Sequence, residues 1–155
     1  MTPVQFAEDL AMELKVVLGH IRLPAPSGEE SGIHIFTFGL PIEKTKGARE
    51  GKFPYVLITL EEGGVKGRTE PQKVKVSLLI GVYDNGMGNQ GKAWVMNIIN
   101  DIGERFLANP VLGPCYYADD EVTWVMDREE EYPYHYGMVG MVFNIPTVRR
   151  ENEYA

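Results

Sequence analysis

A glycine-rich stretch between residues 86 and 92 has the residue types that bind phosphate. It reads GMGNQGK, follows a strand-like run, opens a helix-like run and matches the G-x-G-x-x-G pattern of dinucleotide sites. Glycines at such a turn let a pyrophosphate approach the backbone N–H groups at a helix N-terminus. The same stretch, Gly86–Lys92, nearly matches the G-x-x-x-x-G-K phosphate loop, so nucleotide binding is the first chemistry to consider.

Two departures argue against nucleotide binding at this loop. Ala93 stands where a phosphate loop has the Ser or Thr hydroxyl that binds Mg²⁺. A dinucleotide site has an acidic residue at the end of the next strand, about 20 residues on. Here that distance falls at Glu104, inside a helix-like run. The pattern therefore favours a flexible glycine-rich turn, and a nucleotide-binding enzyme using Gly86–Lys92 is the lesser alternative.

The other residues that could do chemistry are scattered along the chain. The histidines His20, His34 and His135 lie in different expected elements, at no spacing typical of metal ligands. Cys115 is the only cysteine, which excludes an internal disulfide and a thiolate metal cage. The sequence contains no G-x-S-x-G nucleophile motif. We therefore expect no metal and no cofactor to be bound, and we find no nucleophile with a neighbouring base in the sequence pattern.

Charged residues gather in four segments that could form binding surfaces. We expect two long polar connections, 42–53 and 61–72, to be mobile loops, since connections of that length are usually functional or disordered. Their candidate interface residues are Lys44, Lys46, Arg49, Lys66 and Arg68. We also expect two acidic runs to lie in hydrated loops. They consist of Asp119, Asp120, Glu121, Glu129, Glu130 and Glu131.

Hydrophobic periodicity predicts the elements that position these residues. A helix begins at Pro3 after a Thr2 cap and ends near Gly19, and a second helix runs from Gln90 to Leu107, each with an apolar stripe at helical spacing. Alternating or β-branched runs predict strands, the clearest being Val74 to Tyr83. The expected strands are 33–38, 55–60, 74–83, 122–126 and 136–145. The order predicts an α+β fold, a mostly antiparallel mixed sheet with two helices packed on one face.

Length and charge limit the class of protein. The chain has 155 residues, 15 basic and 22 acidic side chains and a formal charge of −7, which suits one globular domain over 1–155 with a frayed tail at 147–155. An acidic protein is a poor nucleic-acid binder because phosphate contacts need Lys and Arg. No apolar run approaches a membrane span, and Glu8 and Asp9 lie where a signal peptide is basic. We therefore expect the cytosol and no membrane partner.

A series of short sequence matches covers roughly residues 53–148. The matching segments are LIGVYD at 79–84, the turn ending at Gly91, MNII at 96–99, NPVLG at 109–113, the Trp124 strand, YPYHYG at 132–137 and FNIPT at 143–147. Together they resemble the tail terminator, or tail completion, proteins of long-tailed bacteriophages with non-contractile tails, a family that includes the minor tail protein U.

The resemblance implies a structural virion protein of the phage tail that is not an enzyme and is assembled in the cytoplasm of the host bacterium. Such proteins form a homo-hexameric ring on the tail tube protein, stop tube polymerisation and present the surface that joins the head–tail connector protein. DNA would pass through such a ring without specific binding, and the acidic runs at 119–121 and 129–131 are candidates to line its channel. The alternatives in the same class are another head–tail connector or adaptor, or the tail tube protein itself.

Overall fold

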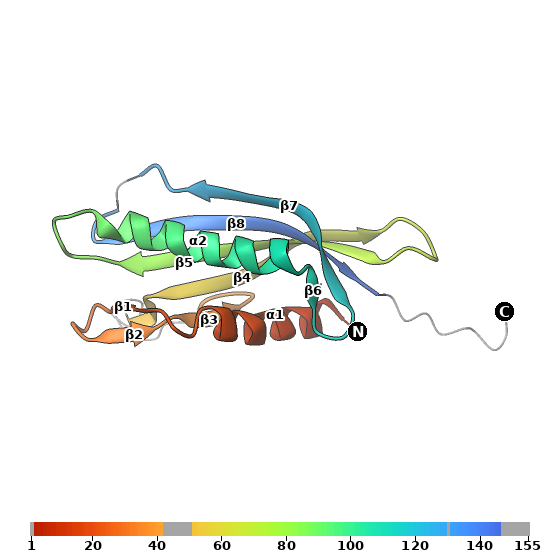
Figure 1. Cartoon of the computed structure of the whole chain (residues 1–155), viewed down its shortest axis with the longest axis horizontal. Helices are drawn as coiled ribbons and strands as arrows, with labels where there is room; N and C mark the ends of the chain where they lie inside the picture. The colour runs from red at the N-terminus through yellow and green to blue at the C-terminus, as the bar shows by residue number, and fades with distance from the viewer. Residues whose placement is uncertain (1, 42–50, 130, 147–155) are drawn as a thin grey trace.

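The computed structural model describes residues 2–41, 51–129 and 131–146. Two helices and eight strands make up this part of the chain (Figure 1). The helices are α1 (Pro3–Val17) and α2 (Gln90–Ala108). The strands are β1 (Arg22–Pro24), β2 (Glu30–Gly32), β3 (His34–Thr37), β4 (Tyr55–Val65), β5 (Gln72–Tyr83), β6 (Val111–Leu112), β7 (Tyr116–Met126) and β8 (Tyr134–Ile145).

Local sequence explains where the helices begin and end. The Thr2 hydroxyl accepts a hydrogen bond from the Gln5 backbone N–H at 3.1 Å, and Pro3 occupies the first helical turn, as the pattern predicted. The Gln5 side chain does not complete a capping box, because its amide donates to Asp9 instead. Helix α2 ends at Ala108, one residue beyond the predicted Leu107, before Asn109 and Pro110.

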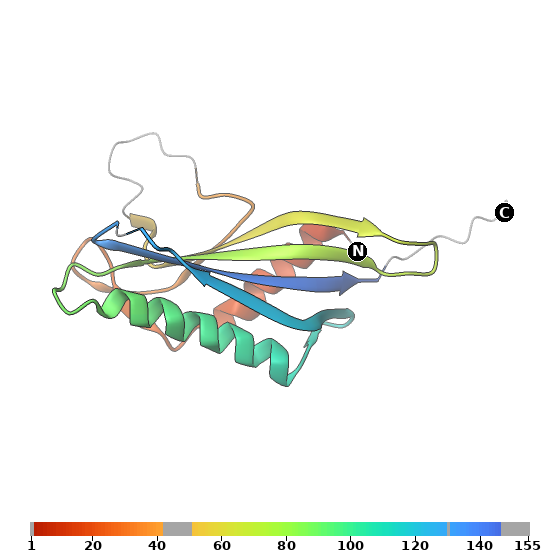
Figure 2. The same ribbon diagram turned by 90° about the horizontal axis from the view of Figure 1, so that it is seen from above.

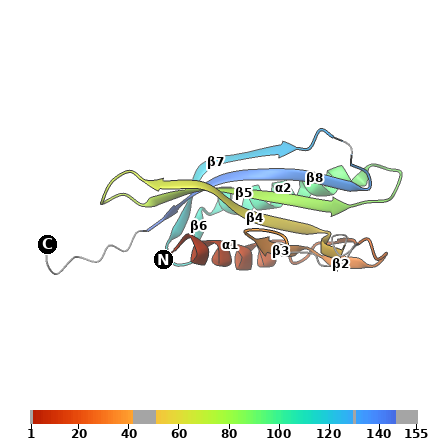
Figure 3. The ribbon, with the colours of Figure 1, turned by 180° about the vertical axis from the view of Figure 1, so that it is seen from behind.

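Six strands form a mixed sheet in the order β3-β4-β5-β8-β7-β6, while β1 and β2 form a separate antiparallel pair. Only the β3–β4 pair is parallel, and the other neighbours in the sheet are antiparallel. In Figure 3, seen from behind, β7, β8, β5 and β4 lie side by side with α2 behind them. The mixed, mostly antiparallel sheet confirms the predicted α+β class.

Two predicted loops are wrong, because half of 61–72 and all of 119–121 lie in strands. Residues 61–65 continue β4, and 62–65 pair with 72–75 of β5, so that only 66–71 form the turn of a long hairpin. Residues 119–121 lie within β7, at a register shift between Ala118 and Val122. Figure 2 shows the β4–β5 hairpin projecting beyond the ends of β7 and β8. Because glycines and acidic residues are depleted in strands, the sequence of these segments does not predict a strand. Their backbone can nevertheless adopt the extended conformation of a strand.

Phe143 of β8 shows that both helices cover the same face of the sheet. Its ring lies 4.9 Å from that of Phe6 in α1 and 5.2 Å from that of Phe106 in α2. The face that carries Phe143 also carries Val76 and Leu78 of β5, both fully buried. One hydrophobic cluster thus joins the sheet and both helices. This arrangement agrees with the predicted placement of the two helices on one face.

Arg105 fixes α1 against α2. Its Nε donates to the Glu13 carboxylate at 2.7 Å, and its guanidinium also donates to the carbonyls of Asn109 and Val111. The Arg105 side chain is 20% exposed, so this fork of hydrogen bonds is partly shielded from water. It therefore sets the direction in which the chain leaves α2 toward β6.

The opposite face of the sheet carries no helix in the described ranges, and its side chains form zones along the strands. A row of apolar side chains crosses four strands, at Leu57, Leu79, Met138 and Val125. Two residues further along each strand toward the hairpin, a second row consists of small or hydroxyl-bearing residues, at Thr59, Ser77, Gly140 and Thr123. Lysines and acids follow at the hairpin end. We call this helix-free surface the open face.

Candidate assembly interface

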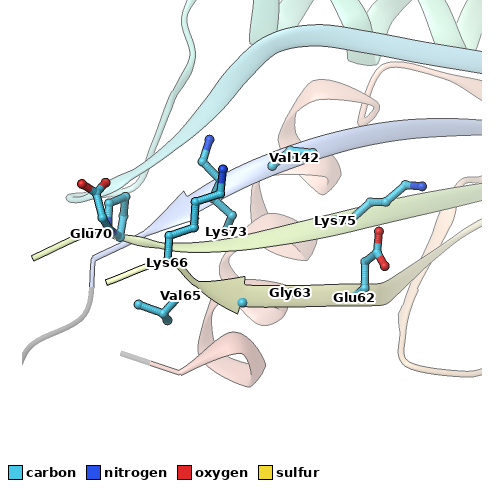
Figure 4. Close-up of a pocket in the computed structure, with 10 residues that line it drawn as sticks. Glu62, Gly63, Val65, Lys66, Glu70, Lys73, Lys75 and Val142 are labelled. Carbon is cyan, nitrogen blue, oxygen red and sulfur yellow. The ribbon is translucent and has the colours of Figure 1, made fainter. Parts of the chain in front are cut away.

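The β4–β5 hairpin forms a basic hollow on the open face. The hollow has a volume of about 380 Å³ and is lined by both hairpin strands and by Val142 of β8. Figure 4 shows the side chains of Lys66 and Lys73 rising together toward β8. Lys75 lines the inner end of the same hollow, and Glu62 and Glu70 contribute the acids. The hollow therefore combines charged side chains with a short apolar floor.

Ion pairing inside the chain divides the hairpin lysines into two groups. Lys73 pairs with Asp119 at 3.0 Å, and Lys75 pairs with Glu61 at 3.5 Å. Lys66 and Arg68, both predicted as interface residues, are exposed at the hairpin turn and form no ion pair with any described residue. Their positive charge is thus available to an external partner.

The acidic run 119–121 forms a bulge on β7, and its first residue, Asp119, is bonded to other side chains of the same chain. Asp119 accepts hydrogen bonds from the Asn144 amide at 2.7 Å and from Lys73. The hydrogen bond from Asn144 is the main reason that the pKa of the Asp119 carboxyl lies below its usual value. Lys73 lowers the pKa further, although partial burial opposes the shift. Asn144 is itself 1% exposed and also donates to the Tyr117 carbonyl. Asp119 is therefore a positioned residue of the sheet.

Asp120 and Glu121 differ from Asp119 in their surroundings. Both are exposed, and neither forms an ion pair with a described residue. A smaller hollow of about 250 Å³ lies between Glu121 and Lys75, over Thr123 and Gly140. The bulge thus presents two negative charges without an ion-pair partner among the described residues. They lie at the β7 edge, across the sheet from the β4–β5 hairpin that carries Lys66 and Arg68.

The structure separates the two acidic runs that the sequence grouped as channel residues. The run at 119–121 lies near the hairpin end of β7, whereas Glu129 and Glu131 lie in the turn between β7 and β8, at the other end of both strands. Glu129 and Glu131 are exposed, and Glu130 lies outside the described residues. Any single acidic surface would therefore have to be built from several copies of the chain.

Part of the predicted interface lies outside the described residues. Lys44, Lys46 and Arg49 fall in 42–50, and the predicted frayed tail falls in 147–155. The end of the connection 42–53 is described and is well packed. Phe53 is 2% exposed, and its ring stacks on Tyr134 with centroids 4.7 Å apart.

An aromatic cluster at the turn end of the open face was not predicted. Phe53 and Tyr55 cover Gly81, where an added Cβ would lie 2.6 Å from the Tyr55 ring. Tyr83 and Tyr134 extend the cluster, with ring centroids 5.9 Å apart. The sequence offered two signals: the alternation of β5, which places Gly81 and Tyr83 on one face, and the closely spaced tyrosines at 132, 134 and 136, which suit either a core or an interface.

The glycine-rich loop is occupied by a carboxylate of the chain itself. Asp84 accepts hydrogen bonds from the backbone N–H groups of Gly86 and Gly91, each at 2.9 Å. A bound phosphate would need the same donors and would meet a like charge. Gly91 is required for packing, because a Cβ there would lie 2.1 Å from Cδ2 of the buried His135 ring. Internal capping and packing thus account for these two glycines.

The histidines and the cysteine do not gather into a site. His20 lies 3.8 Å from Asp101, His34 contacts Ser31, and His135 packs under α2. Within 2–41, 51–129 and 131–146, no group of three His, Cys, Asp or Glu side chains is placed to hold a metal ion. In the same ranges no helix combines the length and hydropathy needed to cross a membrane.

Comparisons with known proteins name no family for this chain. No protein-family model matches the sequence, and no significant match to a curated protein is found. The resemblance to tail terminators therefore stays a prediction, and the geometry described above is the basis for a proposed function.

Proposed function

We propose that this protein is a structural component of a phage tail, which closes into a ring on the end of the tail tube and stops its polymerisation. The observation that carries this proposal is the open sheet, which has helices on one face only and long strand edges without a strand partner among the described residues. Edges of this kind add strands from another chain. The sheet therefore supports a function by assembly.

The charge distribution supports the same proposal. Each copy carries a formal charge of −7, so a ring of six copies would surround passing DNA with predominantly acidic protein. Glu129 and Glu131, together with Asp120 and Glu121, are exposed and are candidates for that channel wall. A like-charged wall disfavours retention of DNA, because phosphate contacts rely on Lys and Arg.

The proposal is tested with tail tubes grown from the tube protein of the same genome. Electron microscopy should find a ring at one end of each tube, and tubes incubated with the protein should stop growing. Tubes that elongate unchanged, with no ring at either end, would contradict the proposal. Long cylinders formed by this protein alone would instead identify it as the tube protein, and binding only to the portal side would identify an adaptor.

The enzyme alternative is tested separately, through stability. A nucleotide present at 100 times its dissociation constant stabilises the folded state by about 2.7 kcal/mol. Because Asp84 already occupies the donors of Gly86 and Gly91, we expect no thermal shift with ATP, GTP or NAD. A shift that disappears in a Lys92→Ala variant would favour the nucleotide-binding alternative.

A further inference from the structure

The sheet has two free edges of similar length, one on each side. On β4, the partner strand β3 pairs only with 55–58, so residues 59–65 have no strand partner on that side among the described residues. On β7, the partner strand β6 pairs only with Tyr116 and Tyr117, which leaves 119–126 unpaired on its outer side in the same ranges. Unpaired backbone N–H and C=O groups of this kind are templates for another strand.

We infer that the β4 edge (59–65) of one copy pairs with the β7 edge (122–126) of a second copy, and that this is the repeating contact of the ring proposed above. Because β4, β5, β8 and β7 are successively antiparallel, β7 runs antiparallel to β4. A second copy placed alongside in the same orientation would therefore continue the antiparallel sheet. Such a contact joins two different patches, which is the heterologous geometry that a ring needs.

Charge complementarity favours this contact over a symmetric one. The β4 edge ends at Lys66 and Arg68, and the β7 edge begins at Asp120 and Glu121, and these four side chains lack an ion pair with any described residue. Pairing two β4 edges with each other would bring the acids at 61–62 together. Pairing two β7 edges would place Glu121 near Asp127. Like charges directly opposite one another on neighbouring strands are destabilising.

The side-chain pattern fits one register of this pairing. If Lys66 lies opposite Glu121 of the next copy, antiparallel counting places Gly64 opposite Thr123 and Gly63 opposite Trp124. Gly64 and Thr123 both belong to the open face, and Gly63 and Trp124 both belong to the helix face, so the pairing keeps each face continuous. Trp124 is 53% exposed, and the glycine opposite it leaves room for the indole ring.

Cysteine trapping tests the contact directly, in a Cys115→Ser background. In one chain Gly64 and Thr123 lie three strand spacings apart across the sheet, about 14 Å, and their rows are also offset by the four residues from Lys73 to Ser77 along β5, so they are too far apart for a disulfide. A Cβ at position 64 meets nothing within 4 Å, so the substitution is tolerated. Under oxidation, Gly64→Cys/Thr123→Cys should give a covalent ladder that ends at a closed ring. Gly64→Cys/Glu104→Cys, with its second thiol on the exposed side of α2, is the matched control and should give no ladder.

A charge-swap experiment gives an independent measure of the same contact. Lys66→Glu/Arg68→Glu should abolish the ring in light scattering, while Lys15→Glu on the exposed side of α1 should not. Adding Asp120→Lys/Glu121→Lys to the first variant should restore the ring. Circular dichroism melting checks that each variant remains folded.

The outcomes separate this inference from the proposed function. A 64/123 pair that gives no ladder, both free and in the presence of tail tubes, overturns the edge contact. Charge reversal that leaves the ring intact, or a charge swap that fails to restore it, overturns the contact as well, even if the protein caps tubes. If the ladder forms but rings never associate with tube ends, the edge contact stands and the tail function fails.

Discussion

At the scale of single residues, Asp119 differs from its two acidic neighbours for reasons that the sequence does not contain. Three consecutive acids predict a hydrated loop, and the prediction holds for the exposure of Asp120 and Glu121. Asp119 instead meets Asn144 and Lys73, which lie 25 and 46 residues away along the chain. Contacts over such separations follow from sheet topology, which local patterns do not specify.

The altered pKa of Asp119 predicts a pH-dependent contribution to stability. Because the folded-state pKa of Asp119 lies below the usual value of an Asp carboxyl, the ionised carboxylate stabilises the fold at every pH above that usual value. This contribution is lost as the pH falls through the folded-state pKa. Asp119→Asn should therefore lower the free energy of unfolding by about 1 kcal/mol at neutral pH, a value reduced by the partial exposure of the pair. The difference from wild type should shrink as the pH falls below the usual range of an Asp pKa and through the lowered folded-state pKa.

Urea unfolding of Asp119→Asn at several pH values measures this contribution. Asp120→Asn is the control, since an exposed acid without a partner should change stability by less than about 0.5 kcal/mol. Equal losses in the two variants, or a loss for Asp119→Asn that persists unchanged in acid, would show that Asn144 and Lys73 do not stabilise the carboxylate.

At the scale of elements, the strong patterns predicted well and the weak ones failed. The alternation of β5 and the apolar stripe of α2 each placed their buried faces correctly, because burial of apolar side chains selects these patterns. The loop predictions for 61–65 and 119–121 were wrong. Both segments are exposed and are charged or glycine-rich, so neither has the side-chain pattern of a strand. Residues 62–65 form a strand through backbone pairing with β5, for which no side-chain pattern is needed, and 119–121 connect the two parts of β7 that pair with β8.

Two glycines of α2 should respond to alanine with opposite signs. At Gly91 an added Cβ would lie 2.1 Å from the His135 ring, so Gly91→Ala should destabilise the fold by about 1–3 kcal/mol through overpacking. At Gly103 the nearest atom is Cγ1 of Val122 at 3.9 Å, so Gly103→Ala should gain up to about 1 kcal/mol of helix propensity. Urea midpoints with unchanged slopes measure both effects. A Gly91→Ala midpoint equal to or above that of the wild type would refute the packing role of Gly91, and a lowered midpoint for Gly103→Ala would refute the gain expected there.

At the scale of the whole molecule, charge is distributed unevenly while its net value is acidic. The hairpin turn carries Lys66 and Arg68, and acids occupy both ends of β7. Composition alone gives the net charge, and from that charge it predicts that the protein does not bind nucleic acids by neutralising their phosphates. It could not place opposite charges on opposite sides of one sheet, because that placement follows from strand order.

If the protein forms the proposed ring, this charge distribution predicts that the ring does not retain DNA. Fluorescence anisotropy with a labelled duplex should give no binding at about 0.15 M salt, since few phosphates could be neutralised. A Glu129→Lys/Glu131→Lys variant tests the role of the turn acids and should raise the affinity measurably if they face the channel. Tight binding by the wild-type protein at this salt concentration would contradict a channel that DNA crosses freely.

The charged groups flanking the open edges also affect how copies of the chain that are not bound to one another behave in solution. An exposed, flat and uncharged edge invites uncontrolled stacking into fibres. Here a register shift interrupts each edge, at Leu60–Glu62 on β4 and at Ala118–Val122 on β7, next to exposed acids. These irregularities act as gatekeepers against aggregation. If copies assemble through these edges as proposed, the irregularities would oppose incorrect pairing of free copies before each meets its correct neighbour.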